Sequence, residues 1–290
     1  MSLVDRLISR FVDPRGLARL RRSAPAGSVV DLAVENLKSE EHWGLAPHAP
    51  FTASDNLYRR CEKVAGRENV LLTTHLAESR EEMSMFRDAN GPLYDFLKEI
   101  GRDMSDCGKR TPLQKFVGNL GEASLSHWLV VHMNELAKSD FDLLATPTMK
   151  SDVVHCPRSH GYFGHLPFPF EKLHELGFTV CLGTDSLASN DDLSLFAEMR
   201  AFQKEFPDVA PDEILKMATV NSARALRQEN ALGKIRLGFL ADLIAIPAAR
   251  AAFAKASSAK SASVFEQIVA FDQPVIWSMF GGKIQGTAAS

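Results

Sequence analysis

The chain repeats one pattern five times: a short apolar run ends at a polar, ionisable residue, and a helical stretch separates it from the next run. The runs are HWGLAPHAP, NVLLTTHLAE, HWLVVHMNE, DVVHCPRSH and FTVCLGTDS. Strands that alternate with helices are typical of βαβ units and of a parallel sheet. In such sheets the carboxyl ends of the strands collect ligand-binding and catalytic groups, whether the sheet is open or closed into a barrel. The pattern therefore predicts an α/β fold with its functional groups at one edge of the sheet.

The residues at the ends of these runs are of the types that bind metal ions. They are four histidines and one aspartate: His48, His75, His132, His155 and Asp185. Neutral imidazole and carboxylate are the usual ligands of a catalytic zinc or iron. Their recurrence at successive strand ends predicts a metal-dependent hydrolase.

Two of the runs favour a site role most strongly. In HLAE, His75 and Glu78 lie three residues apart as the strand ends, which suits a metal ligand beside a general acid or base. The alternative is a buried histidine next to a surface glutamate. His132 follows the apolar sequence WLVV, where an imidazole needs a partner, and a site role is favoured over a core histidine.

The other polar residues also have structural interpretations. His48 lies between two prolines and either hydrogen-bonds a turn or contacts substrate. His155 is expected to orient its loop, whereas His160 and His165 are candidates to face substrate. An aspartate after a strand, such as Asp185, is as common at a helix N-cap as in catalysis. We assign His48 and His160 to substrate binding.

Composition limits the kinds of partner that the protein is expected to bind and the cellular compartment in which it is expected to lie. A net charge of −3 and a pI near 6.3 give no electrostatic footprint for nucleic acid, and no apolar run approaches the roughly 20 residues that cross a bilayer. The four cysteines lie far apart without a CxxC pair, which favours reduced thiols over disulfides or a structural zinc site. We expect a cytoplasmic protein with a small-molecule substrate and no nucleic-acid or membrane partner, and we leave a homo-oligomer open.

Several motifs occur in an order that resembles a known family. They are GLAPHAPFTAS, THLAES, VVHMNEL, VVHCPRSH, LGTDSLASNDDLSLFAEMR and ATVNSARAL, followed by LGKIRLGFLADLIAI. From about Trp43 to near the C-terminus they resemble landmarks of the amidohydrolase superfamily. The resemblance is strongest to the aminohydrolase branch that includes guanine, cytosine and S-adenosylhomocysteine deaminases and the chlorotriazine hydrolases. It implies an enzyme with a (β/α)8 barrel, one divalent metal, with zinc favoured and iron as the alternative, and a small β-sandwich.

The resemblance also implies a role for each strand-end residue. His75 resembles the metal ligand at the end of strand five, and Glu78 resembles the proton shuttle. His132 resembles the strand-six histidine that polarises substrate or water. Asp185 resembles the strand-eight metal ligand and general base, and His48 resembles a substrate-side histidine of strand four. These roles imply hydrolysis of a non-peptide carbon–nitrogen bond, with deamination of an amino-substituted heterocycle as the expected reaction.

The N-terminal part departs from the family pattern. Family members carry a His-x-His pair at the end of the first barrel strand, whereas the first histidine here is His42, and only strands four to eight are recognised. We expect a helical segment at 1–42, an incomplete barrel at 43–232, and C-terminal β-sandwich strands with a low-complexity insert at 233–290. We favour N-terminal truncation, with weak activity or none, over a compact homologue that lost catalysis. The alternative function is a non-catalytic amidohydrolase-like protein that acts by binding only.

Overall fold

The computed structural model describes residues 44–120, 127–146, 151–248 and 263–285. The predicted helical segment 1–42, with His42, and residues 249–262 of the low-complexity insert lie outside these ranges. The described part of the chain divides into two compact units. The first unit consists of the residues up to His155 together with Phe163–Val180. The second unit consists of Cys156–Tyr162 and the residues from Cys181 onward. The domain boundaries predicted at 43 and 233 remain predictions.

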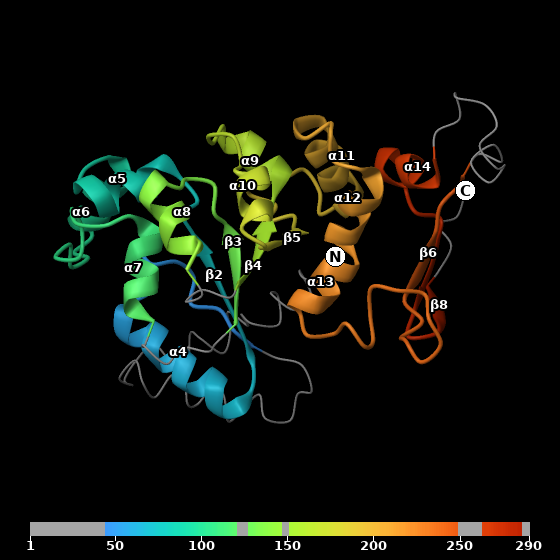
Figure 1. Ribbon diagram of the computed structural model, residues 1–290, viewed down its shortest axis with the longest axis horizontal. Coiled ribbons are helices and arrows are strands. Elements are labelled where there is room, and N and C mark those ends of the chain that lie inside the picture. Colours follow the sequence, from blue (N-terminus) through green and yellow to red (C-terminus); the bar gives the residue numbers. More distant parts are fainter. Residues whose placement is uncertain (1–43, 121–126, 147–150, 249–262, 286–290) are drawn as a thin grey trace. The chain divides into compact units, whose positions relative to one another are not determined.

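The main sheet has five strands in the spatial order β1-β2-β3-β4-β5, which is also their order in the chain (Figure 1). The strands are β1 (Gly44–Leu45), β2 (Leu71–Leu76), β3 (Trp128–His132), β4 (Ser151–His155) and β5 (Thr179–Leu182). The pairs β1–β2, β2–β3 and β3–β4 are parallel. Successive parallel strands in this order, joined by helices, match the predicted part of an amidohydrolase barrel, and these five strands do not close into a full barrel.

Sequence pattern explains how the central strands are buried. Every residue of β3 and β4 is buried, as expected for parallel strands covered on both faces. In β2, burial alternates: Leu72, Thr74 and Leu76 are buried, whereas His75 is half-buried and lies on the opposite face. The β2–β3 register pairs His75 with Val131 and Leu76 with His132, so both histidines reach the same end of the sheet.

Helices join these strands and cover them. In the first unit they are α4 (Asp55–Glu68), α5 (Arg80–Asp88), α6 (Pro92–Glu99), α7 (Pro112–Asn119), α8 (Lys138–Leu144) and α10 (Phe170–Glu175). Helices α4 and α7 pack against β2. Tyr58, Phe116 and Trp128 form an aromatic cluster with ring centroids 5.2 to 5.8 Å apart. The Tyr58 hydroxyl lies 2.7 Å from Thr74 Oγ1, which satisfies both buried hydroxyls.

The second unit holds further helices and a separate sheet. They are α9 (Pro157–Phe163, of which Phe163 falls in the first unit), α11 (Leu195–Glu205), α12 (Pro211–Ala218), α13 (Val220–Ala225) and α14 (Val264–Ala270). Helices α12 and α13 are separated at Thr219, whose φ of −128° and ψ of −84° lie outside the helical region. No helix among the described residues is long and apolar enough to cross a membrane.

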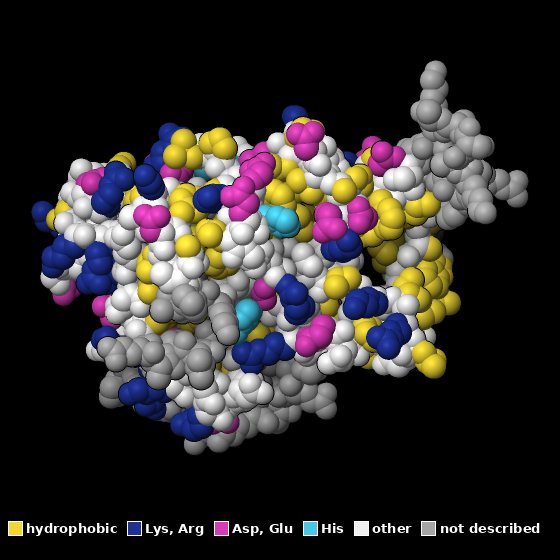
Figure 2. Space-filling model, viewed as in Figure 1, with side chains coloured by type: hydrophobic (Ala, Val, Ile, Leu, Met, Phe, Trp, Pro, Cys, Tyr) yellow, Lys and Arg dark blue, Asp and Glu magenta, His cyan; other side chains and the backbone are white. Residues whose placement is uncertain are grey.

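The small sheet is antiparallel, with the order β6-β7-β8, and corresponds to the predicted C-terminal sandwich strands. Its strands are β6 (Leu243–Ala245), β7 (Trp277–Phe280) and β8 (Lys283–Gln285). Ile244, Phe280 and Ile284 are exposed, and Figure 2 shows hydrophobic side chains over β6 and β8.

Candidate active site and metal centre

His75 is held in place by the backbone that follows β1. Its backbone N–H donates to the carbonyl of His48 at 2.8 Å, and its Nδ1 lies 3.2 Å from the same carbonyl oxygen. Because a carbonyl oxygen only accepts, Nδ1 carries the proton in this contact and Nε2 keeps its lone pair. A histidine that ligates a metal through one ring nitrogen usually donates a hydrogen bond from the other, often to a backbone carbonyl.

His132 ends β3 in an unusual backbone conformation. Its φ is +81° and that of Met133 is +56°, in the left-handed region that costs non-glycine residues energy. The turn is fixed by Met133 N–H, which donates to the Leu76 carbonyl at 3.0 Å. The imidazole of His132 is buried, and its ring centroid lies 5.3 Å from that of His75. The two histidines therefore lie together at the carboxyl ends of adjacent strands.

Glu78 faces His132. Its Oε1 lies 3.5 Å from His132 Nε2, and its side chain is 25% exposed. Asn134 Nδ2 donates to the Glu78 carbonyl at 3.1 Å, which ties the residue to the loop after β3. A half-buried carboxylate beside an imidazole is an arrangement that can transfer protons.

Asp185 lies three residues after β5 and also has a positive φ, +56°. Two hydroxyl groups donate to its Oδ2: that of Ser159 at 2.7 Å and that of Ser189 at 3.2 Å. These bonds fix the orientation of the carboxylate, as supporting groups commonly do for a metal ligand.

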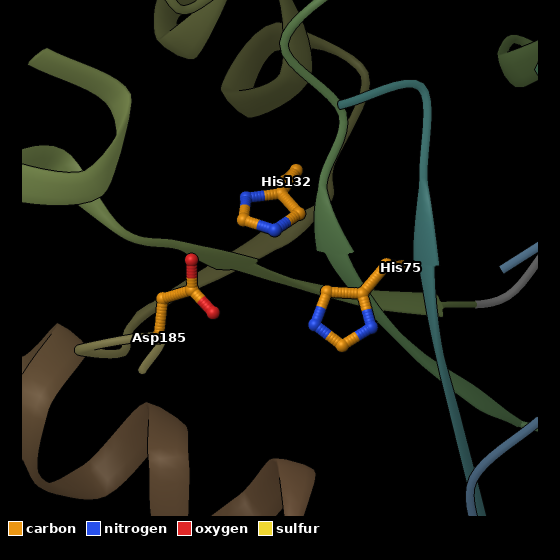
Figure 3. A group of neighbouring side chains, drawn as sticks. All are labelled: His75, His132 and Asp185. Carbon is orange, nitrogen blue, oxygen red and sulfur yellow. The ribbon is translucent and has the colours of Figure 1, made fainter. Parts of the chain in front are cut away.

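Figure 3 shows the side chains of His75, His132 and Asp185. Each offers one ligand atom, and these atoms all lie within 4.8 Å of one another. Two imidazole nitrogens and a carboxylate oxygen are the donor types that zinc prefers, and three protein ligands are typical of catalytic sites that keep a position for water. The donor set therefore fits a divalent metal ion. His132, expected as a polarising residue, is also placed as a candidate ligand.

The histidines assigned to substrate binding lie in different surroundings. His48 is exposed, its ring centroid is 5.0 Å from that of His75, and its Nδ1 lies 2.8 Å from Thr52 Oγ1. The expected turn bond is therefore present, and the substrate contact remains a prediction. His160 is buried on α9, with Nε2 4.0 Å from Glu205 Oε1 on α11. Its role in substrate binding also remains a prediction.

His155 and His165 lie in packed surroundings. His155 is fully buried and stacks on Phe168, with centroids 3.8 Å apart and an interplanar angle of 6°. His165 is half-buried, and burial lowers its pKa, although the nearby acids Glu135 and Glu81 oppose the change.

Sequence reasoning missed three residues that support this region. Ser159 binds Asp185, as described above. Glu82 is almost fully buried, and its Oε2 accepts the backbone N–H of Glu78 at 2.8 Å. Glu198 is equally buried and accepts the backbone N–H of Arg158 at 2.9 Å. Burial raises the pKa of Glu82 to about 8 and that of Glu198 to about 7. Only Glu82 had a local signal, the Ser79-x-x-Glu82 spacing of a capping box.

Comparison with known proteins identifies the family. The model of the amidohydrolase family matches residues 19–276. The chain belongs to the amidohydrolase family. It is 34% identical over 209 residues to a 5-methylthioadenosine/S-adenosylhomocysteine deaminase of Pyrococcus furiosus, covering 70% of this chain and 44% of the relative. A protein of the same name from Saccharophagus degradans is 34% identical over 212 residues, covering 70% and 42%. The chain thus spans less than half the length of these relatives.

Solved structures of amidohydrolases share the fold. Aminofutalosine deaminase of Helicobacter pylori superposes with a TM-score of 0.72 at 23% identity, covering 91% of this amidohydrolase chain and 65% of that protein. An adenosine deaminase from Xanthomonas campestris with bound zinc has a TM-score of 0.66 at 23% identity, covering 90% and 55%. E. coli guanine deaminase has a TM-score of 0.66 at 18% identity, covering 92% and 62%. The predicted membership in the aminohydrolase branch is confirmed.

Proposed function

We propose that this chain carries the catalytic groups of a metal-dependent hydrolase that removes an amino group from a heterocycle. The observation that carries the proposal is the grouping of His75, His132 and Asp185, with Glu78 3.5 Å from His132. The deaminase names of the curated relatives support the same reaction.

His75 and Asp185 would hold the metal, with His132 as the third donor of the group. Zinc is proposed on the basis of the donor types and the zinc-containing neighbour, with iron as the alternative. When bound, such an ion lowers the pKa of water toward neutrality and so makes a nucleophile available. The donation from His75 Nδ1 to the His48 carbonyl directs Nε2 to ligation.

The chain's own side chains would move the protons. Water adds to the carbon that carries the amino group, and a carboxylate oxygen of Asp185 accepts the water proton. Glu78, when protonated at Oε1, donates to a ring nitrogen of the substrate and regains a proton from the added hydroxyl group, while Asp185 passes the proton that it took from water to the leaving amine. The carbon–nitrogen bond then breaks, and ammonia leaves.

The substrate class we propose is an adenine-containing nucleoside with a thioether at its 5′ position. The support is the name shared by the relatives from Pyrococcus furiosus and Saccharophagus degradans. A cytoplasmic location fits such a substrate and remains part of the proposal.

Ammonia release from the zinc-loaded chain tests the proposed function. S-adenosylhomocysteine, 5′-methylthioadenosine, adenosine, guanine and cytosine serve as substrates, with the change in ultraviolet absorbance as an independent readout. We expect deamination of the thioether nucleosides, its loss in Asp185→Asn, and unchanged activity in His174→Ala, which alters an exposed histidine of α10. Failure of the zinc-bound wild type to release ammonia from any of the five contradicts the proposal and favours a protein that acts by binding only.

A further inference from the structure

A buried carboxyl group lies directly behind the proposed proton shuttle. Glu82 belongs to the first turn of α5, and its side chain is 1% exposed. Its Oε2 accepts the backbone N–H of Glu78 at 2.8 Å. The backbone N–H of Ala77 also lowers the pKa of this carboxyl group, against the larger effect of burial. A glutamate that is fully buried needs such partners, because burial without them costs a large free energy.

The segment that carries Glu78 is held from two directions. On one side, Asn134 Nδ2 donates to the Glu78 carbonyl, and Glu135 N–H donates to the Ala77 carbonyl at 2.9 Å. On the other side lies Glu82. Ala77 has φ +51°, a conformation that a non-glycine residue keeps only when its surroundings impose it. The backbone position of Glu78 is therefore set by these contacts.

We propose that Glu82 is a positioning residue for Glu78: its carboxyl group fixes the backbone that presents the Glu78 side chain to His132. This inference rests on the proposed role of Glu78 in deamination.

A simpler role for Glu82 is to cap α5, and the structure separates the two roles. The cap of α5 is Ser79, whose Oγ accepts Glu82 N–H at 3.2 Å. The Glu82 carboxyl group binds the N–H of Glu78, which lies one residue before the cap. Ser79→Ala therefore removes the cap and keeps the acceptor for Glu78, whereas Glu82→Ala removes the acceptor.

Glu82→Gln is a conservative variant that should preserve the hydrogen bond to Glu78. Burial favours the neutral carboxyl, and the carbonyl oxygen of glutamine is a neutral acceptor of the same length. Glu82→Gln should therefore keep the bond to Glu78 N–H, and it provides a second variant in case Glu82→Ala leaves too large a cavity.

Steady-state kinetics of the zinc-loaded full chain give the first test. We expect Glu82→Ala to lower kcat about tenfold with little change in KM, because a misplaced catalytic group slows the reaction without weakening binding. Ser79→Ala and Glu82→Gln should stay within about twofold of wild type. Combining Glu82→Ala with Glu78→Gln should lower kcat no further than Glu78→Gln alone. Equal losses in Ser79→Ala and Glu82→Ala, or independent effects in the double variant, would overturn the proposal.

Amide hydrogen exchange gives a test that needs no activity. We expect the Glu78 amide to exchange at least about tenfold faster in Glu82→Ala than in Ser79→Ala, after normalisation to the buried Val130 amide of β3. Glu82→Gln should resemble wild type. Equal exchange of the Glu78 amide in Glu82→Ala and Ser79→Ala would overturn the inference. If the wild type does not deaminate, the proposed function fails by itself, and the exchange result still decides the role of Glu82.

Discussion

Oε1 of Glu78 lies 3.5 Å from Nε2 of His132, and the two side chains come from the ends of adjacent parallel strands. This contact places a carboxylate able to move a proton beside a buried imidazole. It predicts that the carboxylate acts in the chemical step rather than in metal binding.

Glu78→Gln tests that separation. The amide keeps the size of the side chain and cannot transfer the proton, so kcat should fall by about 10²- to 10⁴-fold while zinc content stays unchanged. The matched control is Glu81→Gln, an exposed glutamate of α5, which should keep wild-type kcat. Parallel loss of zinc and activity in Glu78→Gln would show that the carboxylate serves the metal instead.

The raised pKa of Glu82 predicts a dependence of stability on pH. The group ionises near 4.5 in the unfolded chain and near 8 in the folded one, because burial penalises its charge. Between these values the folded state binds one more proton, so its stability falls as pH rises, at most by roughly 1.4 kcal/mol per pH unit. Glu82→Gln has no such group. Urea unfolding of both proteins from pH 4.5 to 8 should show the wild type losing stability relative to the variant, and a constant difference would contradict the assignment.

A buried lysine predicts a local contribution to stability. Lys115 Nζ lies 2.7 Å from both Asp55 Oδ1 and Asp106 Oδ2, and its side chain is only 5% exposed. Burial alone would raise the pKa of Asp106, yet hydrogen bonds from Arg102 and Lys115 outweigh it and hold the pKa below its usual value.

Lys115→Met leaves these carboxylates without their central partner and should cost about 2 kcal/mol in urea unfolding. Lys216→Met is the control, because Lys216 forms exposed pairs within α12 and its loss should change the free energy of unfolding little. Equal costs for the two variants would show that the network around Lys115 is not specifically stabilising.

The hydroxyl group of Ser159 predicts an indirect effect on metal affinity. It donates to Asp185 Oδ2 at 2.7 Å, so its removal should loosen the proposed ligand. Ser159→Ala should weaken zinc binding about 10- to 100-fold, the usual effect of losing such a support. Ser105→Ala, at an exposed position, should leave the affinity unchanged. If Ser159→Ala binds zinc with wild-type affinity, Ser159 does not support Asp185 as a metal ligand.

The local pattern of apolar residues was enough to predict the buried strands of the main sheet. The continuous apolar runs before His132 and His155 became the fully buried strands β3 and β4. The rule that parallel strands end at one edge predicted the edge of the sheet at which His75 and His132 lie.

Contacts between distant segments were beyond such reasoning. Ser159 and Asp185 are 26 residues apart, and neither has a local signal that pairs them. Glu205, the acidic partner of the buried His160, lies on α11, 45 positions later in the chain.

A zinc titration tests the central claim that His75, His132 and Asp185 form one metal site. Isothermal titration of the metal-free chain should give about one zinc per chain. His75→Ala, His132→Ala and Asp185→Asn should each weaken binding by at least about tenfold, the scale set by loss of even a supporting contact. His174→Ala should bind as the wild type does. Absence of zinc binding at saturating supply, or equal affinity in all four variants, would contradict the account.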